Sequence, residues 1–271
     1  SLVGSEMCIR DSSSILSKKF AEGLNGLVLD VKTGNGAFMR ERDEARELAR
    51  RLVEVSGMAG LPCTALMTDM SQPLAWTAGN ALEVREVIEF VGGRRRHPRL
   101  AEVTLALGAA ALQRVGLASG ESEASTKCHE ALESGRVAER FARMVSAQGG
   151  PVDLLENPDW YLPPAPVIRP VVAPHSGWIA AYDTRAVGMV VNHLGGGRRQ
   201  LGDKIDPRVG LSALGRIGDS IETGAPLAML HAADEEGWNK AARRLTGSVV
   251  IDTERPPEAA CILEKIDWNE S

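Results

Sequence analysis

A glycine-rich segment is the first feature of this sequence that could support chemistry. Residues 33–37 read Thr-Gly-Asn-Gly-Ala and directly follow a short apolar run. A loop of this kind after a strand can cradle a phosphate on its backbone N–H groups at the start of the next helix. The complete phosphate-loop and dinucleotide-loop patterns are both absent from the segment. By itself it therefore favours a tight turn.

A hydroxyl and an ammonium form the second candidate pair. Ser14 and Lys18 lie four positions apart in an amphipathic stretch, so on a helix they would share one face. Together they could meet the polar edge of a ligand. Such pairs are also common on solvated helix faces, and the two residues alone do not decide between these interpretations.

A carboxylate after a loop is the third candidate. Glu86 follows the turn at Gly79 and Asn80, and together with carbonyl groups of the preceding loop it could hold a hard cation through oxygen. The alternative is an exposed glutamate paired with Arg85. The five histidines show neither metal-binding nor catalytic-triad spacing, and they are His97, His129, His175, His193 and His231.

The elements that must position these residues begin with a strand–helix–strand unit. Apolar runs at 26–31 and 61–68 flank an amphipathic pattern over 41–55, which predicts a βαβ unit with a parallel strand pair. Further helices are predicted over 81–90, 99–115 and 125–147. After a Pro-rich boundary, strands are predicted at 171–172, 177–180, 186–191 and 226–230, with a helix over 234–245.

The predicted fold class is therefore α/β, with a mixed, largely parallel central sheet flanked by helices and a C-terminal α+β module. That module is expected to be β-rich and similar to a barrel-sandwich. Residues 1–12 show no start methionine, no clear period and no signal-peptide pattern, and we expect them to be a non-native leader.

Composition excludes several classes of protein. The formal net charge is −5, from 31 Lys and Arg against 36 Asp and Glu, so no basic field favours nucleic acid or an anionic membrane as a partner. The hydrophobic share is 44%, which is normal for a folded chain of 271 residues. The four cysteines are far apart in the sequence, which indicates a reducing, cytoplasmic setting.

The C-terminal third contains a pattern of another class. Residues 173–179 and 218–227 resemble the Ala-Pro and Gly-Asp sequence patterns of biotinyl and lipoyl carrier domains. Such carriers display a lysine on a tight hairpin, and residues 192–199 contain none. A non-catalytic carrier or interaction protein therefore remains the alternative function.

Four stretches, at 14–19, 29–39, 68–74 and 78–86, together resemble the family of thymidine and pyrimidine-nucleoside phosphorylases. The resemblance extends from about residue 14 to the tail. It implies a remnant of a helical domain over 13–24, a glycosyltransferase-like α/β domain over 25–157 and the family's C-terminal α+β domain over 158–271.

The family's reaction is implied by the same resemblance. Inorganic phosphate, the co-substrate, attacks C1′ of a pyrimidine 2′-deoxynucleoside such as thymidine and yields the free base and 2-deoxy-α-D-ribose 1-phosphate. Ser14 and Lys18 match the residues that contact the pyrimidine. Lys32, Gly34 and Gly36 match the loop that borders the cleft, which replaces the simple-turn interpretation of that loop.

Cofactor and partners follow from the family in the same way. No cofactor is required, and a monovalent or divalent cation is expected at the carbonyls of Leu74 and Thr77 and the carboxylate of Glu86. The family forms cytoplasmic homodimers. Its Lys-His-Ser-Thr-Gly-Gly phosphate loop and its base-reading arginine have no match in these 271 residues, so this polypeptide on its own is expected to be inactive.

Overall fold

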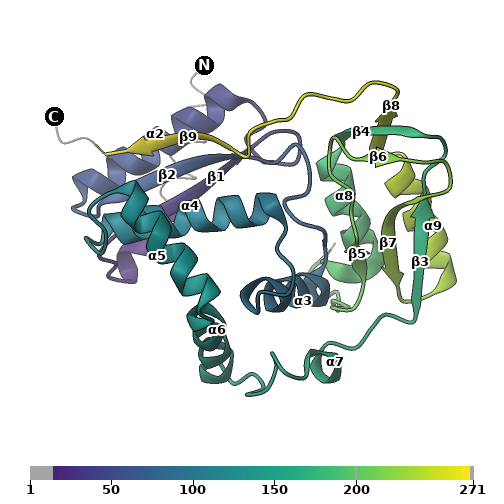
Figure 1. The fold of residues 1–271 in the computed structure, drawn as a ribbon, viewed down its shortest axis with the longest axis horizontal. Helices are drawn as coiled ribbons and strands as arrows, with labels where there is room; N and C mark the ends of the chain where they lie inside the picture. Colours follow the sequence, from purple (N-terminus) through teal and green to yellow (C-terminus); the bar gives the residue numbers. More distant parts are fainter. Residues whose placement is uncertain (1–14, 199, 269–271) are drawn as a thin grey trace. The chain divides into compact units, whose positions relative to one another are not determined.

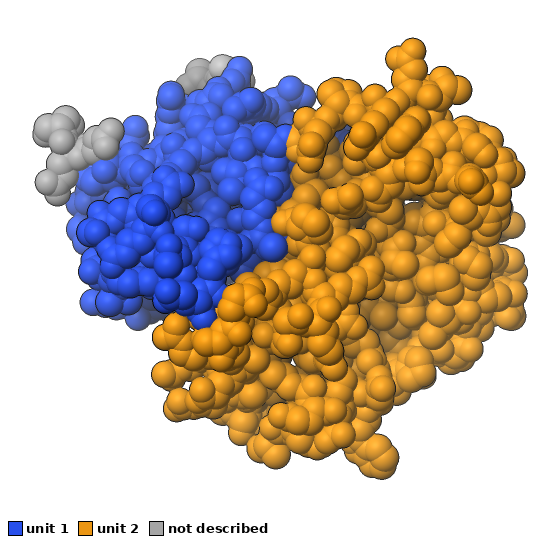
Figure 2. All heavy atoms as spheres, viewed as in Figure 1, with its two compact units in different colours: residues 1–69, 101–130, 260–271 blue, residues 70–100, 131–259 orange. Residues whose placement is uncertain are grey.

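The computed structural model describes residues 15–198 and 200–268, whose helices and strands are shown in Figure 1. The chain divides into two compact units (Figure 2). Unit 1 combines 1–69, 101–130 and 260–271, and unit 2 combines 70–100 and 131–259. The C-terminal segment thus belongs to the same unit as the first strands, although the sequence predicted it within the C-terminal module.

Unit 1 is built on a three-stranded sheet in the order β1-β2-β9. The strands β1 (Leu27–Thr33) and β2 (Cys63–Asp69) are parallel and are connected through α2 (Arg42–Met58). β9 (Ile262–Asp267) adds to β2 in the antiparallel direction, as the yellow arrow in Figure 1 shows. The predicted βαβ unit is confirmed, and β1 lies at an edge of this sheet among the described residues.

The core of unit 1 lies between α2 and the sheet. Apolar positions on α2 recur at helical spacing, so one stripe of the helix is buried. That stripe packs against side chains that alternate on β1 and β2. The buried residues are Ala45, Leu48, Ala49, Leu52 and Val53 on the helix and Leu27, Val31, Cys63, Ala65 and Met67 on the strands.

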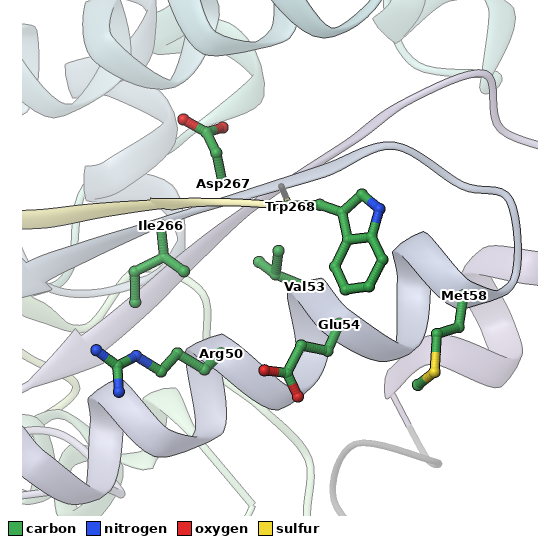
Figure 3. Close-up of a pocket in the computed structure, with 7 residues that line it drawn as sticks. All are labelled: Arg50, Val53, Glu54, Met58, Ile266, Asp267 and Trp268. Atoms are coloured by element: carbon green, nitrogen blue, oxygen red, sulfur yellow. The ribbon is translucent and has the colours of Figure 1, made fainter. Parts of the chain in front are cut away.

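The end of β9 covers the C-terminal turns of α2. A groove of about 460 Å³ lies here. Figure 3 shows the indole of Trp268 above the helix, between Val53 and Met58. A Cβ built on Gly57 would lie 2.4 Å from an atom of that indole ring. Gly57 therefore gives Trp268 room to pack directly on the helix backbone.

This contact predicts that the effect of Gly57→Ala on stability changes sign when Trp268 is replaced by alanine. Inside a helix, Gly→Ala normally stabilises by about 0.5–1 kcal/mol. In the wild-type background we expect Gly57→Ala to destabilise by about 1–2 kcal/mol instead, because its methyl group displaces the indole. In a Trp268→Ala background the same change should become stabilising. Urea unfolding of the four proteins measures both effects, and equal effects in the two backgrounds would contradict the contact.

In the sequence, helices follow β2 and occupy most of the stretch from residue 80 to residue 161. They are α3 (Asn80–Val91), α4 (Pro98–Arg114), α5 (Glu121–Glu133), α6 (Arg136–Ala147) and the short α7 (Pro158–Tyr161). The prediction of one helix over 125–147 is wrong. The chain breaks at Gly135, whose φ of +78° is a left-handed conformation that glycine adopts without steric cost.

The C-terminal part of unit 2 contains two antiparallel sheets of three strands. One has the order β3-β7-β5, and the other has the order β6-β4-β8. The first contains β3 (Val167–Val172), β7 (Pro226–Ala232) and β5 (Gly210–Ser212), and the second contains β6 (Ser220–Ile221), β4 (Gly177–Tyr182) and β8 (Val249–Asp252). The mixed α/β fold with a β-rich C-terminal module is confirmed.

Two helices and a short π-helical segment, η1 (Asn192–Gly196), complete this module. α9 (Glu235–Thr246) forms where a helix was predicted, but α8 (Thr184–Val191) replaces the strand predicted over 186–191. The carboxylate of Asp183 accepts a hydrogen bond from the Ala186 N–H at 2.9 Å and caps the helix. Val187 and Val190 lie three apart and are buried, which is helical rather than alternating spacing. Within the described residues, no helix is both long and apolar enough to cross a membrane.

Candidate functional site

A cavity of about 560 Å³ runs along β1 within unit 1. Most of its wall is apolar, and among the described residues that line it only two are charged. The lining residues are Ile15, Leu29, Asp30, Val31, Lys32, Phe38, Leu48 and Leu52. An apolar cavity with a few polar groups is the usual form of a small-molecule site.

The glycine-rich loop closes on itself at one end of this cavity. The Gly34 N–H donates to the Arg40 carbonyl at 3.2 Å, and the Ala37 N–H donates to the Gly34 carbonyl at 3.0 Å. These two amide groups are therefore committed to the turn and do not form a phosphate cradle. The loop instead presents Phe38, 76% exposed, to the cavity between two buried neighbours, Ala37 and Met39.

The resemblance assigned Lys32, Gly34 and Gly36 to the border of the cleft. Lys32 lines the cavity, whereas the two glycines shape the loop without lining it. Gly34 has a φ of +110°, which explains the need for glycine at that position. Phe38 is a lining residue that the sequence analysis did not single out, although an aromatic residue inside a glycine-rich loop is a signal that could have found it.

Of the two residues predicted to contact the pyrimidine, the structure describes only Lys18. Ser14 lies outside the described residues. Lys18 is exposed on helical residues 15–21, which Leu16 anchors because its side chain is only 1% exposed. Ile15 lines the cavity one turn before Lys18, so the two side chains project from the same helix face.

Two charged residues and a threonine are joined on the sheet next to the cavity. The Lys32 ammonium donates to Asp30 Oδ2 at 2.5 Å and to Thr68 Oγ1 at 2.9 Å. The Thr68 hydroxyl donates to Asp30 Oδ1 at 2.5 Å. Lys32 pairs with Thr68 in the strand register, which explains their closeness. The sequence analysis missed Asp30 and Thr68, although charged residues alternating inside an apolar strand were a usable signal.

Glu86 occupies a separate place, within unit 2. Its side chain is buried at 7% exposure, so the alternative interpretation, an exposed glutamate paired with Arg85, is wrong. The backbone N–H of Trp76 donates to Glu86 Oε1 at 3.1 Å, and the Thr77 hydroxyl donates to Glu86 Oε2. Arg85 pairs with Asp159 at 2.5 Å instead. The structure thus brings Glu86 against Thr77, while no hydrogen bond is recorded between Glu86 and Leu74.

Close packing of two backbones holds the loop that carries Thr77. The Ala78 N–H donates to the Leu211 carbonyl at 3.0 Å, and the Leu211 N–H returns a bond of 2.8 Å to Ala78. Beside this bridge, Gly79 and Gly210 lie almost in contact, since a Cβ on Gly210 would be 3.1 Å from the Gly79 Cα. The loop before α3 is therefore fixed by β5.

A buried histidine packs on the same loop. The His97 ring, 1% exposed, meets the Trp76 indole edge-on at a centroid distance of 4.6 Å. Burial, together with the nearby guanidinium groups of Arg216 and Arg99, lowers the pKa of His97 to about 4. His97 is therefore neutral at pH 7 and packs as an uncharged ring.

Metal binding through several side chains has no support in the described part of the chain. Among those residues, no group of three or more His, Cys, Asp and Glu side chains could hold a metal ion. A cation at Glu86 would therefore depend on backbone carbonyl oxygens.

The carrier alternative requires a lysine at the tip of a hairpin. The lysines after residue 158 are Lys204, Lys240 and Lys265. Lys240 lies within α9, Lys265 lies within β9, and Lys204 lies in the long connection between η1 and β5. None of the three is placed as a carrier lysine would be.

Two family models match the chain in sequence order. Residues 10–138 match the a/b domain of the glycosyl transferase family, and residues 178–252 match the C-terminal domain of pyrimidine nucleoside phosphorylase. Together the matches support membership of the pyrimidine nucleoside phosphorylase family and an enzyme that transfers a pentosyl group.

Proposed function

We propose that this chain is part of a thymidine phosphorylase. The reaction would convert thymidine and phosphate into thymine and 2-deoxy-α-D-ribose 1-phosphate in pyrimidine nucleoside salvage. The observation that carries the proposal is the pair of family matches, which cover an α/β domain and the domain characteristic of pyrimidine nucleoside phosphorylases. The cytoplasmic homodimer that the resemblance implies is part of the same proposal.

The cavity on β1 supports a pyrimidine as the ligand. Phe38 offers an exposed aromatic face on which a flat base could stack. Negative charge develops on the departing pyrimidine during phosphorolysis, and an ammonium beside it would stabilise that charge. Lys18 has an exposed side chain on the helix face that leads to the cavity, and we assign it this role.

A binding experiment tests the base-binding role. Replacing Lys18 by Met should weaken thymine binding about 10-fold, because a charged hydrogen bond to the base is lost. Lys19→Met is the matched control, since the Lys19 ammonium is paired with Glu22 at 3.1 Å and should leave the affinity unchanged. Isothermal titration of the 271-residue chain measures both. Equal affinity for thymine and the purine base hypoxanthine would overturn the proposal.

Turnover requires a phosphate site as well. The resemblance places phosphate on a Lys-His-Ser-Thr-Gly-Gly loop, and these 271 residues contain no such motif. We propose that this polypeptide, assayed alone, binds the base without catalysing phosphorolysis. Ultraviolet detection of thymine release from thymidine, with uridine in parallel, would refute this if turnover were observed.

The surroundings of Glu86 fit a hard cation. Both carboxylate oxygens face the loop that carries Thr77, each keeps a further lone pair, and the candidate ligand set is entirely oxygen. Glu86 and the carbonyl oxygens of Leu74 and Thr77 would hold the ion. A bound cation would supply positive charge next to an anionic substrate.

Cation binding predicts a stabilisation that depends on this carboxylate. An ion that binds only the folded state stabilises by about 2.7 kcal/mol at a concentration 100 times its Kd. We expect K⁺ or Ca²⁺ to raise the melting temperature of the wild type but not of Glu86→Gln. Glu89→Gln, on the same helix, is the matched control. An equal rise in all three proteins would show that the ion acts elsewhere.

A further inference from the structure

The corner formed by Asp30, Lys32 and Thr68 is the strongest polar feature of the cavity region. Its three side chains share the face of the sheet opposite to Val31, because Asp30 and Lys32 lie two positions apart on β1 and Lys32 is in register with Thr68 on β2. Thr68 is fully buried, whereas Lys32 and Asp30 keep 29% and 23% exposure. The buried hydroxyl thus fixes two charged groups that a ligand can still reach.

The hydrogen bonds within this corner leave a defined set of free sites. An ammonium carries three donors, and Asp30 and Thr68 take two of those of Lys32. Each oxygen of Asp30 accepts one bond and keeps lone pairs for another. The corner therefore offers one ammonium donor beside two carboxylate acceptors, and its two charges cancel.

We propose that Asp30, Lys32 and Thr68 form a subsite for the hydroxyl groups of the ligand's pentose. A hydroxyl can donate to Asp30 and accept from Lys32 at the same time. A phosphate ion carries one or two negative charges at neutral pH, and the Asp30 carboxylate would repel that charge. The inference rests on the proposed function and deepens it, because it assigns recognition of the sugar to β1 and β2 and recognition of the base to the Lys18 side.

Comparison of a nucleoside with its free base separates the two contributions. We would titrate the 271-residue chain with thymidine, thymine and inorganic phosphate by isothermal calorimetry. Lys32→Met should weaken thymidine binding about 10-fold and leave thymine binding within about 2-fold. Thr68→Val, which keeps the shape of a buried side chain, should act in the same direction. Lys19→Met is the control for loss of a lysine.

Asp30→Asn provides a second, independent variant. It leaves the charge of Lys32 uncompensated, so we expect weaker thymidine binding together with detectable phosphate binding. Weakening of thymine and thymidine by equal factors in Lys32→Met would overturn the sugar subsite but leave the proposed function intact. Wild-type affinity for thymidine no greater than for thymine would do the same. Failure of the wild type to bind either compound would refute both proposals.

Discussion

Gly210→Ala is expected to destabilise the chain by about 4 kcal/mol. A Cβ at this position would lie 2.3 Å from the Ala78 carbonyl oxygen, far inside van der Waals contact. The backbone cannot yield without breaking the pair of hydrogen bonds between Ala78 and Leu211. The φ of Gly210 is also +150°, a conformation that side chains disfavour. Steric overlap and backbone strain therefore act together.

A second glycine separates these two effects. Gly224 has a φ of +81°, but nothing lies within 4 Å of a Cβ built on it. Gly224→Ala should cost only the left-handed penalty of about 1–2 kcal/mol. Urea unfolding at pH 7 measures both variants. If Gly210→Ala costs no more than Gly224→Ala, the close approach of the two backbones is wrong, and with it the fixed position of the loop that carries Thr77.

The sequence predicted local elements well where one periodicity dominated. The strands β1 and β2 and the helix α2 were found because apolar runs and a 3.6-residue pattern follow one another within about forty positions. The run at 186–191 was wrongly predicted as a strand, because its six small and apolar residues carry no clear period. The cap at Asp183, one residue before α8, was the overlooked signal.

Long-range pairing could not be predicted in the same way. β9 joins β2 although most of the chain lies between them in the sequence, and no property of 262–267 selects that partner. The burial of Glu86 was missed for another reason, since its partners Trp76 and Thr77 are close in sequence but lie in the loop before α3, where no periodic pattern indicates the path of the chain. The resemblance nevertheless named Lys32, which lines the cavity on β1, and it named Glu86 together with Thr77, whose hydroxyl donates to Glu86, because it carries tertiary information that periodicity lacks.

The pH dependence of stability should reveal the environment of His97. Its pKa is about 4 in the folded chain, against about 6.5 for an ordinary histidine. The unfolded chain therefore binds a proton between these two pH values while the folded chain does not. The stability that comes from neutral His97 is fully present above about pH 6.5, falls as the pH is lowered, and is lost by about pH 4. The total loss should be about 3 kcal/mol.

A variant that lacks only His97 isolates this contribution. His231 is also buried, and its burial lowers its pKa, so the wild type alone would not be decisive. The difference in unfolding free energy between the wild type and His97→Gln should shrink steadily from pH 6.5 to pH 4. A difference that stays constant would show that His97 titrates normally in the folded chain.

The groups around His97 explain where the acid effect should appear first. Arg216, Arg99 and Arg95 all disfavour its protonation, and Asp219 only partly offsets them. A proton on His97 would therefore add charge beside the Trp76 ring, over which Arg95 already lies at 3.9 Å. The backbone N–H of Trp76 donates to Glu86, so displacement of Trp76 from His97 would also disturb the candidate cation site. Stabilisation by K⁺ or Ca²⁺ should accordingly weaken over the same pH range in the wild type, but not in His97→Gln.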